Sequence, residues 1–231
     1  MRQLAIGDIH GCLEPLNQLL DWVAPTTADQ LIFLGDYVDR GPDSRGVLDR
    51  LIELRHHLPV IYLRGNHEQM MVEAYHGGHS EKKMWLSVGG AQTLGSYGQL
   101  PGRSGTLSDV PAAHWEFLEC HLVDYYETDQ LIFTHASVVC DRPMSEQPED
   151  ALRWDFLPES LCHYSGKRVI CGHTSQKSGL PKVVPGAVCI DTFAHGGGWL
   201  TCLDALTGQY WQTNLLGHRR EGHLLDRDQS T

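Results

Sequence analysis

Short apolar runs and helical patterns alternate over the first third of the chain. Runs at residues 4–6, 31–34 and 60–63 have the length of buried strands, and each is followed by glycine and polar residues. Between them, apolar residues spaced at i, i+3, i+7 and i+10 predict two amphipathic helices, one from Leu13 and one around Val47. This alternation predicts βαβ units and a largely parallel sheet, in which ligands bind at the carboxyl ends of the strands.

The rest of the chain divides into a helical part and a strand-rich part. Residues 68–119 are helical but irregular, with glycine pairs as breaks, and predict a helical cap. From residue 123 the strand pattern returns, in runs at residues 131–134, 169–171, 183–184, 188–191, 199–203 and 209–213. We therefore predict one α/β domain over residues 1–217, a sandwich of two mixed sheets flanked by helices, with the second sheet mainly antiparallel. Residues 218–231 are polar and predict a C-terminal tail.

Composition and charge narrow the class of protein. The 231 residues are 41% hydrophobic, without an apolar run long enough to cross a bilayer or a signal-peptide pattern, which predicts a cytoplasmic protein. The formal net charge of −11 argues against nucleic acid or an anionic membrane as a partner. Seven cysteines without a CxxC pair argue against a disulfide framework or a zinc knuckle, and Cys12 is interpreted as a packing residue.

Polar residues follow each of the three N-terminal strands at the same point. The loops read Gly-Asp-Ile-His-Gly from residue 7, Gly-Asp-Tyr-Val-Asp-Arg-Gly from residue 35 and Gly-Asn-His-Glu from residue 65. Asp8 and His10 lie on the same side of an extended segment, so both can reach one metal ion. Asp8 and Asp36, buried at two adjacent strand ends, would repel each other unless a cation lay between them. The three loops therefore predict a metal site, to which Asn66 offers an amide oxygen.

These loops resemble the signature blocks of the calcineurin-like metallophosphoesterases. They are most similar to the phosphoprotein phosphatase family, which contains the eukaryotic serine/threonine phosphatases and the lambda phage phosphatase. Phe-Thr-His-Ala at residues 133–136, Cys-Gly-His-Thr at 171–174, and Ile-Asp-Thr at 190–192 with three glycines at 196–198 resemble the later blocks of that family. The resemblance runs from residue 4 to about residue 213, and residues 70–130 are matched only by their position between blocks.

The resemblance implies a centre of two divalent metal ions. It assigns the first ion to Asp8, His10 and Asp36, and the second to Asp36, Asn66, His135 and His173. Carboxylate and imidazole ligands suit manganese, iron or zinc, and manganese is our first choice. In such centres a water that bridges the ions becomes acidic enough to attack phosphorus as hydroxide.

The resemblance also implies roles for the neighbouring side chains. His67, oriented by Asp39, would protonate the leaving group, and Arg40 would bind phosphate oxygens with its planar fork. Glu68 is interpreted as a structural hydrogen-bond acceptor, and the histidines outside the motifs as surface residues.

Two positions depart from the family pattern. The family usually has a second phosphate-binding arginine two positions after a tryptophan, but here Trp154 is followed by Asp155 and Phe156. We predict that Arg153 takes this role from a shifted register. Near the C-terminal glycines the family often has a tyrosine at the rim of the site, and this chain has His195.

Three functions remain open on the sequence. The leading hypothesis is a serine/threonine phosphatase that acts on a phosphoprotein or a small phosphoester. The second is a symmetrical bis(5'-nucleosyl)-tetraphosphatase, for which Arg103 and Trp85 would supply an extra cation and a stacking surface. The third is a metal-binding scaffold without catalysis, which is disfavoured because the six ligands, Asp39 and His67 are all present.

Overall fold

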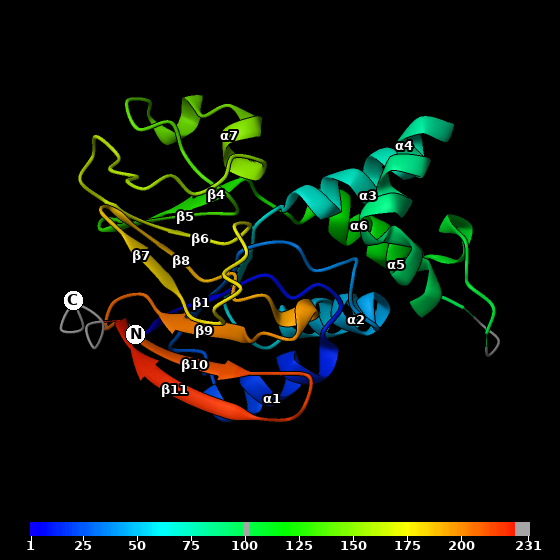
Figure 1. The fold of residues 1–231 in the computed structure, drawn as a ribbon, viewed down its shortest axis with the longest axis horizontal. Coiled ribbons are helices and arrows are strands. Elements are labelled where there is room, and N and C mark those ends of the chain that lie inside the picture. Colours follow the sequence, from blue (N-terminus) through cyan, green and yellow to red (C-terminus); the bar gives the residue numbers. More distant parts are fainter. Residues whose placement is uncertain (99–101, 225–231) are drawn as a thin grey trace.

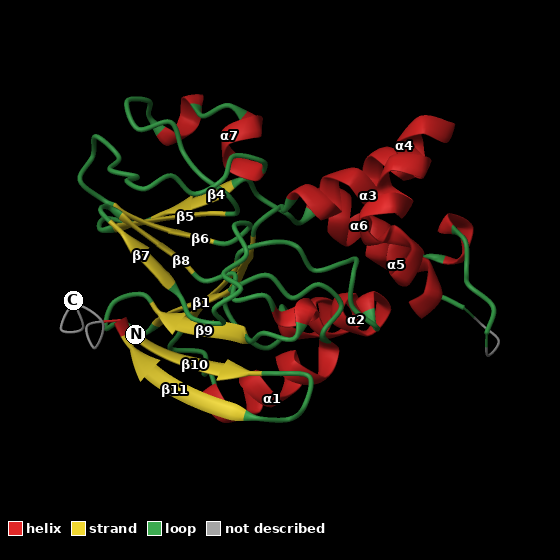
Figure 2. Ribbon diagram, in the orientation of Figure 1, coloured by secondary structure: helices red, strands yellow, loops and turns green. Residues whose placement is uncertain are grey.

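The computed structural model describes residues 1–98 and 102–224 and shows two stacked β-sheets with helices on the outside (Figures 1 and 2). The first sheet has the order β11-β10-β9-β1-β2-β3. Its strands are β1 (Gln3–Ile6), β2 (Gln30–Phe33), β3 (Val60–Tyr62), β9 (Leu200–Asp204), β10 (Gln209–Thr213) and β11 (Arg219–His223). The second sheet has the order β4-β5-β6-β8-β7. Its strands are β4 (Tyr125–Glu127), β5 (Leu131–Thr134), β6 (Arg168–Cys171), β7 (Lys182–Val184) and β8 (Ala187–Cys189).

The alternation of side chains along the strands builds the layers. In β1, Leu4 and Ile6 pack in one hydrophobic cluster with the outer helices α1 (Leu13–Val23) and α2 (Ser44–Leu54). The residue between them, Ala5, packs in a second cluster with Phe133 of β5, between the sheets. A third cluster covers the outer face of the second sheet, where the short helix α7 (Glu149–Arg153) lies. The predicted sandwich and both predicted helices are confirmed.

The helical part stands to one side of the sandwich, at the right of Figure 1. It contains α3 (Asn66–His76), α4 (His79–Trp85), the π-helical turn η1 (Leu86–Gly90), α5 (Ala91–Ser96), the 3-10 turn η2 (Leu107–Asp109) and α6 (Ala112–Cys120). Two further 3-10 turns are η3 (Met144–Glu146) and η4 (Ala194–Gly196). Among the residues described, no helix is long and apolar enough to cross a bilayer.

Two expectations about the strands are wrong. The second sheet is not mainly antiparallel, because β5, β6 and β8 pair in parallel and only its two edge pairs are antiparallel. The antiparallel strands β9 and β10 instead join the first sheet, where β9 pairs with β1. Residues 219–223, expected in a polar tail, form β11 and pair with β10 along its whole length. Residues 225–231 lie outside the described part of the chain.

A partly exposed ion pair ties the start of the chain to the turn before β2. Asp29, 6% exposed, accepts hydrogen bonds from the Arg2 guanidinium at 2.7 and 3.0 Å and from the backbone N–H of Thr26 at 2.9 Å. Hydrogen bonding to Arg2 holds the pKa of Asp29 well below its ordinary value. The carboxylate therefore stabilises the folded chain above its unfolded pKa of about 3.9, and this contribution is lost as the pH falls.

We expect Asp29→Asn to lower the free energy of unfolding by about 2 kcal/mol at pH 7, since charge-assisted hydrogen bonds are lost. The difference in the free energy of unfolding between the variant and the wild type should be smaller at pH 3. Urea unfolding at pH 7 and at pH 3 measures this difference. Asp21→Asn, at an exposed aspartate, is the matched control. A difference that does not change with pH would contradict the role of the ion pair.

Candidate active site

The carboxyl ends of strands from both sheets meet at one place. Asp8 follows β1, Asp36 follows β2, Asn66 follows β3, His135 follows β5 and His173 follows β6. All are buried except the half-buried His173. Seven described residues other than glycine have positive φ, and five of them belong to these loops: His10, Asp36, Asp39, Arg40 and His173. Such backbone strain collects at functional sites, where the surrounding structure enforces it.

Asp36 lies at the centre of the predicted ligands. Its Oδ2 is 3.3 Å from Nε2 of His10, and its Oδ1 is 3.4 Å from Nε2 of His135. Each imidazole is oriented by its other nitrogen, since Nδ1 of His10 bonds the Val38 carbonyl at 2.9 Å and Nδ1 of His135 bonds the Leu34 carbonyl at 2.8 Å. One oxygen of Asp36 thus faces each histidine, as a bridging ligand requires.

Two overlapping groups of ligand atoms share Asp36. His10, Asp36 and His67 form one group, and Asp36, His135 and His173 form the other, with the ligand atoms of each group within 4.8 Å of one another. Asn66 joins the second group, because its Oδ1 is 3.1 Å from Nε2 of His135.

The predicted ligand Asp8 lies beside these groups rather than in them. Its carboxylate accepts the backbone N–H of His173 at 3.0 and 3.2 Å.

The electrostatics of the site fit a divalent cation. Burial raises the pKa of Asp8 well above its ordinary value, and the nearby carboxylates of Asp191 and Asp36 raise it further. Burial also disfavours the charged form of Asp36, but the surrounding imidazoles outweigh it and hold the pKa of Asp36 below its ordinary value.

The imidazoles supply neutral donors to the same site. Burial lowers the pKa of His10 and of His135, and it lowers the pKa of His173 to about 4. Clustered buried carboxylates with neutral imidazoles are a donor set that suits manganese, iron or zinc.

His67 and Asp39 form a buried pair at the edge of this centre. Nδ1 of His67 is 2.7 Å from Oδ2 of Asp39, and both side chains are fully buried. Burial lowers the pKa of His67, but the charges of Asp36 and of the hydrogen-bonded Asp39 outweigh it and raise the pKa above its ordinary value. Nε2 of His67 has no hydrogen-bond partner within the described chain. The ring is therefore fixed by one nitrogen and presents the other to the site.

The predicted phosphate-binding residue Arg40 is exposed at the mouth of the site. Its Nη1 is 2.9 Å from Nε2 of His10 and 3.4 Å from Nε2 of His195. His195, at the position of the family's tyrosine, packs edge-on against His10 with ring centroids 4.8 Å apart. Burial lowers the pKa of His195 to about 4, and the positive charge of Arg40 is a smaller cause of the same shift.

Arg153 does not take the role predicted for it. Its side chain is buried and forms ion pairs with Asp124 at 2.5 Å and with Glu149 at 2.9 Å, and it donates to Gln69 at 3.2 Å. These partners hold the guanidinium outside the lining of the pocket described below, so it is not placed to bind a phosphate there. Phe156, at the position where the family's arginine stands, is 73% exposed and stacks on His173 at 5.3 Å.

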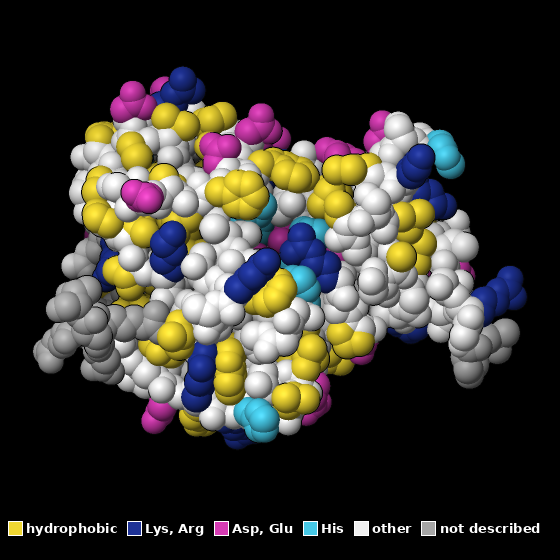
Figure 3. All heavy atoms as spheres, viewed as in Figure 1, with side chains coloured by type: hydrophobic (Ala, Val, Ile, Leu, Met, Phe, Trp, Pro, Cys, Tyr) yellow, Lys and Arg dark blue, Asp and Glu magenta, His cyan; other side chains and the backbone are white. Residues whose placement is uncertain are grey.

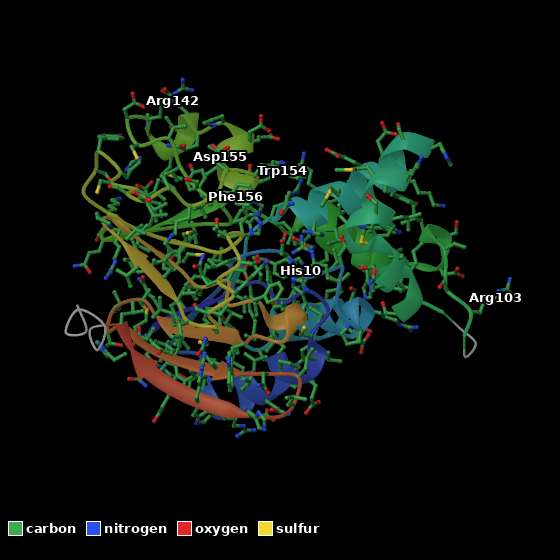
Figure 4. All side chains as sticks on the ribbon, viewed as in Figure 1. His10, Arg103, Arg142, Trp154, Asp155 and Phe156 are labelled. Atoms are coloured by element: carbon green, nitrogen blue, oxygen red, sulfur yellow. The ribbon has the colours of Figure 1, made fainter. Side chains whose placement is uncertain are left out.

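Arg103 and Trp85 are not placed to make the contacts predicted for a dinucleotide substrate. Arg103 lies at the far end of the helical part, away from the loop that carries His10 (Figure 4). Trp85 is fully buried and cannot stack on a base. Two histidines that were expected on the surface, His114 and His163, are buried instead. His114 forms hydrogen bonds with Tyr97 and Asp49, and His163 forms them with Ser165 and the Arg142 carbonyl.

The interpretation of Glu68 is confirmed. Its carboxylate accepts backbone N–H groups from Asp36, Tyr37, Val38 and Gly65 at 2.7 to 3.2 Å. Cys12 is buried in the hydrophobic core, as interpreted. Sequence reasoning missed Asp191, whose buried carboxylate lies near Asp8, and it missed two side chains that bind Asp39, namely Trp85 and Thr93. Asp191 belongs to the Ile-Asp-Thr block at residues 190–192, but no role was inferred for its carboxylate. No spacing rule links Trp85 and Thr93 to the motifs, because both come from the helical part.

A pocket of about 500 Å³ opens over the centre. Its polar lining residues are Asp36, Arg40, Asn66, His67, His173, Thr174 and Ser175, and its apolar lining residues are Met70, Met84, Val88, Trp154 and Phe156. Figure 3 shows His and Lys/Arg side chains gathered around the hollow in the middle of this face, with hydrophobic side chains along its upper rim. Trp154 and Phe156 lie between α7 and the loop of His10 (Figure 4). The pocket thus has a charged floor and apolar walls.

Two bacterial phosphatases are similar in sequence to about a third of this chain. Serine/threonine-protein phosphatase 1 of Salmonella typhimurium is 41% identical over 86 residues, 37% of this chain and 37% of that protein. The symmetrical bis(5'-nucleosyl)-tetraphosphatase of Pseudomonas putida is 42% identical over 84 residues, 36% of this chain and 28% of that protein. The chain thus matches well under half the length of these two relatives.

Solved structures extend the likeness to nearly the whole chain. A crystal structure described provisionally as a diadenosine tetraphosphatase has a TM-score of 0.63 at 20% identity, over 96% of this chain and 93% of that one. The cold-active protein-tyrosine phosphatase of a Shewanella species has a TM-score of 0.59 at 15% identity, over 95% of this chain and 80% of that one. At these identities the likeness shows a common fold.

A family model settles the classification. The model described as calcineurin-like phosphoesterase matches residues 1–177, which carry all three N-terminal loops and both later histidine blocks. This match confirms the resemblance found in the sequence. The chain therefore belongs to the calcineurin-like phosphoesterases, the family of metal-dependent phosphoester hydrolases.

Proposed function

We propose that this chain hydrolyses phosphoserine and phosphothreonine monoesters with His67 as the general acid. The observation that supports this best is the state of the His67 ring. Nδ1 is held by Asp39 at 2.7 Å, while Nε2 has no hydrogen-bond partner among the described residues, lies 3.9 Å from Oδ2 of Asp36, and belongs to a ring that lines the pocket. A leaving oxygen bound in the pocket would complete that nitrogen's hydrogen bonding and take its proton.

The other residues of the site have distinct tasks. Asp8, His10, Asp36, Asn66, His135 and His173 would hold two divalent ions, with manganese our first choice and iron or zinc as alternatives. When bound, such ions polarise the phosphoryl group and acidify a coordinated water. Arg40 would bind phosphate oxygens from the mouth, since its exposed guanidinium lines the pocket. Asp39 would stabilise the imidazolium form of His67 through their hydrogen bond.

The charge of the pocket favours a substrate with a single phosphate. Arg40 is the lining residue with a permanent positive charge, whereas a dinucleoside tetraphosphate carries four phosphates. The apolar walls, which include Met84 and Phe156, suit the side chains of a peptide that bears the phosphorylated residue. We therefore place a phosphoprotein or phosphopeptide first among the substrates.

A symmetrical bis(5'-nucleosyl)-tetraphosphatase is the second candidate. Trp154 and Phe156 line the pocket and offer aromatic faces for a nucleobase, although Arg103 and Trp85 are not placed to help. A scaffold without catalysis is the least favoured candidate, because four of the proposed ligands (His10, Asp36, His135 and His173) lie close together and the Asp39–His67 pair adjoins them.

A direct comparison of substrates tests the proposal. Phosphate release from a phosphoserine peptide and cleavage of diadenosine tetraphosphate are measured with the manganese-loaded enzyme. We expect kcat/KM to favour the phosphopeptide by at least about tenfold, because either substrate would meet the two ions, and beyond them the lining offers a single arginine for the remaining phosphates of the dinucleotide. Turnover of the dinucleotide alone would exclude the proposed substrate, and turnover of neither with two ions bound would support the scaffold.

A further inference from the structure

One segment of the helical part packs directly on the turn that carries Asp39 and Arg40. It runs from Trp85, the last residue of α4, through η1 to Thr93 in α5. Within η1, Gly89 has a φ of +128°, and a Cβ placed on it would lie 2.7 Å from the backbone nitrogen of Arg40. The Gly89 carbonyl accepts the Arg40 backbone N–H at 3.3 Å. The backbone of Gly89 is not helical, and the kink that it makes between α4 and α5 fits closely against the turn of Asp39 and Arg40.

Two side chains of this segment donate hydrogen bonds to the Asp39 carboxylate. Nε1 of Trp85 is 3.0 Å from Oδ1 and 2.9 Å from Oδ2, and Oγ1 of Thr93 is 2.7 Å from Oδ1. With Nδ1 of His67 at 2.7 Å from Oδ2, both oxygens of Asp39 have donors. Asp39, Trp85 and Thr93 are each 0% exposed, so these bonds replace all contact with water. A buried carboxylate whose two oxygens both accept hydrogen bonds is held in one position and one orientation.

Thr93 also holds the backbone of the turn. Its Oγ1 accepts the backbone N–H of Asp39 at 2.9 Å and lies 2.9 Å from Oγ of Ser44. Asp39 and Arg40 have φ angles of +72° and +68°, which residues with a Cβ rarely adopt. Such a conformation persists only where its surroundings enforce it. Thr93 and Gly89 supply that enforcement from the helical part.

We propose that Trp85 and Thr93 are positioning residues for proton donation. They hold Asp39, Asp39 holds Nδ1 of His67, and Nε2 of His67 is thereby kept at the pocket. The segment from Trp85 to Thr93 then supports proton donation, in addition to the wall that Met84 and Val88 contribute to the pocket. This inference rests on the proposed role of His67 as the general acid.

Trp85→Phe and Thr93→Val test the proposal. Phenylalanine keeps an aromatic ring beside Gly90 but removes the N–H donor, and valine keeps the shape of threonine without its hydroxyl. We expect each change to lower kcat for a phosphoserine peptide by about tenfold and kcat for nitrophenyl phosphate by less than about threefold. The reason is that a good leaving group needs little protonation. Thr93→Ser, which keeps the hydroxyl, should retain wild-type rates on both substrates.

Two reference variants separate the possible failures. Trp115→Phe changes a tryptophan of the same helical part that stacks on Tyr75 at 4.0 Å, and it should match the wild type on both substrates. If Trp85→Phe and Thr93→Val slow both substrates equally, their role is only structural and the inference is wrong. If His67→Asn discriminates between the substrates and these two variants do not, the inference fails while the proposed function stands. Equal losses in His67→Asn would overturn both.

Discussion

Asp36→Asn is expected to lower kcat/KM for a phosphopeptide by at least about a thousandfold and to reduce bound metal from two ions per chain to one or none. The two oxygens of Asp36 face different imidazoles, at 3.3 Å from His10 and 3.4 Å from His135. An amide has nearly the same size, but it carries no charge and offers only one good ligand oxygen. The change therefore removes the proposed bridging ligand while it leaves the shape of the site intact.

Metal analysis of the purified variant gives a result that does not depend on activity. Asp141→Asn, at an exposed aspartate outside the site, should keep both the metal content and the rate of the wild type. Two tightly bound ions in Asp36→Asn, together with normal turnover, would show that Asp36 does not bridge. Loss of activity with both ions retained would separate the catalytic role of Asp36 from metal binding.

The centre of this site can be predicted from the sequence because the strand ends carry it. The glycine and polar residues after each short apolar run mark the carboxyl ends of parallel strands, and topology brings those ends together. Asp8, Asp36 and Asn66 follow from this rule alone. His135 and His173 required the family resemblance, since a histidine after a strand has no spacing that distinguishes a ligand from a core residue.

The partners of Asp39 could not be predicted in the same way. Trp85 and Thr93 are 46 and 54 residues further along the chain, in helices with no motif of their own. A buried tryptophan looks the same in a sequence whether its N–H binds a catalytic carboxylate or a backbone carbonyl. The contact depends on how the helical part packs on the sandwich, and tertiary packing is not encoded in a local pattern.

The errors share a physical cause. Arg153 stands next to Trp154 in sequence, but ion pairs with Asp124 and Glu149 hold its guanidinium away from the pocket lining. Strand β11 is polar because it lies at the edge of the first sheet, where its exposed side chains meet water while its backbone pairs with β10. In each case a contact with a residue distant in the sequence determines the structure. The local residue types fit both the predicted and the observed arrangement.

His67→Asn should separate acid catalysis from metal binding more clearly than any other change. We expect kcat for a phosphoserine peptide to fall by about a thousandfold and kcat for nitrophenyl phosphate by about tenfold, because an amide cannot protonate the poor leaving group. The number of bound ions should stay at two. This second measurement matters because His67 lies with His10 and Asp36 in one group of potential ligand atoms.

If the variant binds only one ion, His67 is a metal ligand, and its Nε2 binds an ion rather than the leaving group. If both ions stay and the two substrates slow equally, the proton comes from another group. The proposal is supported only if both ions stay bound and the loss of activity is larger for the poorer leaving group. In the structure, the hydrogen bond to Asp39 at 2.7 Å fixes Nδ1 of His67 and leaves Nε2 for the substrate.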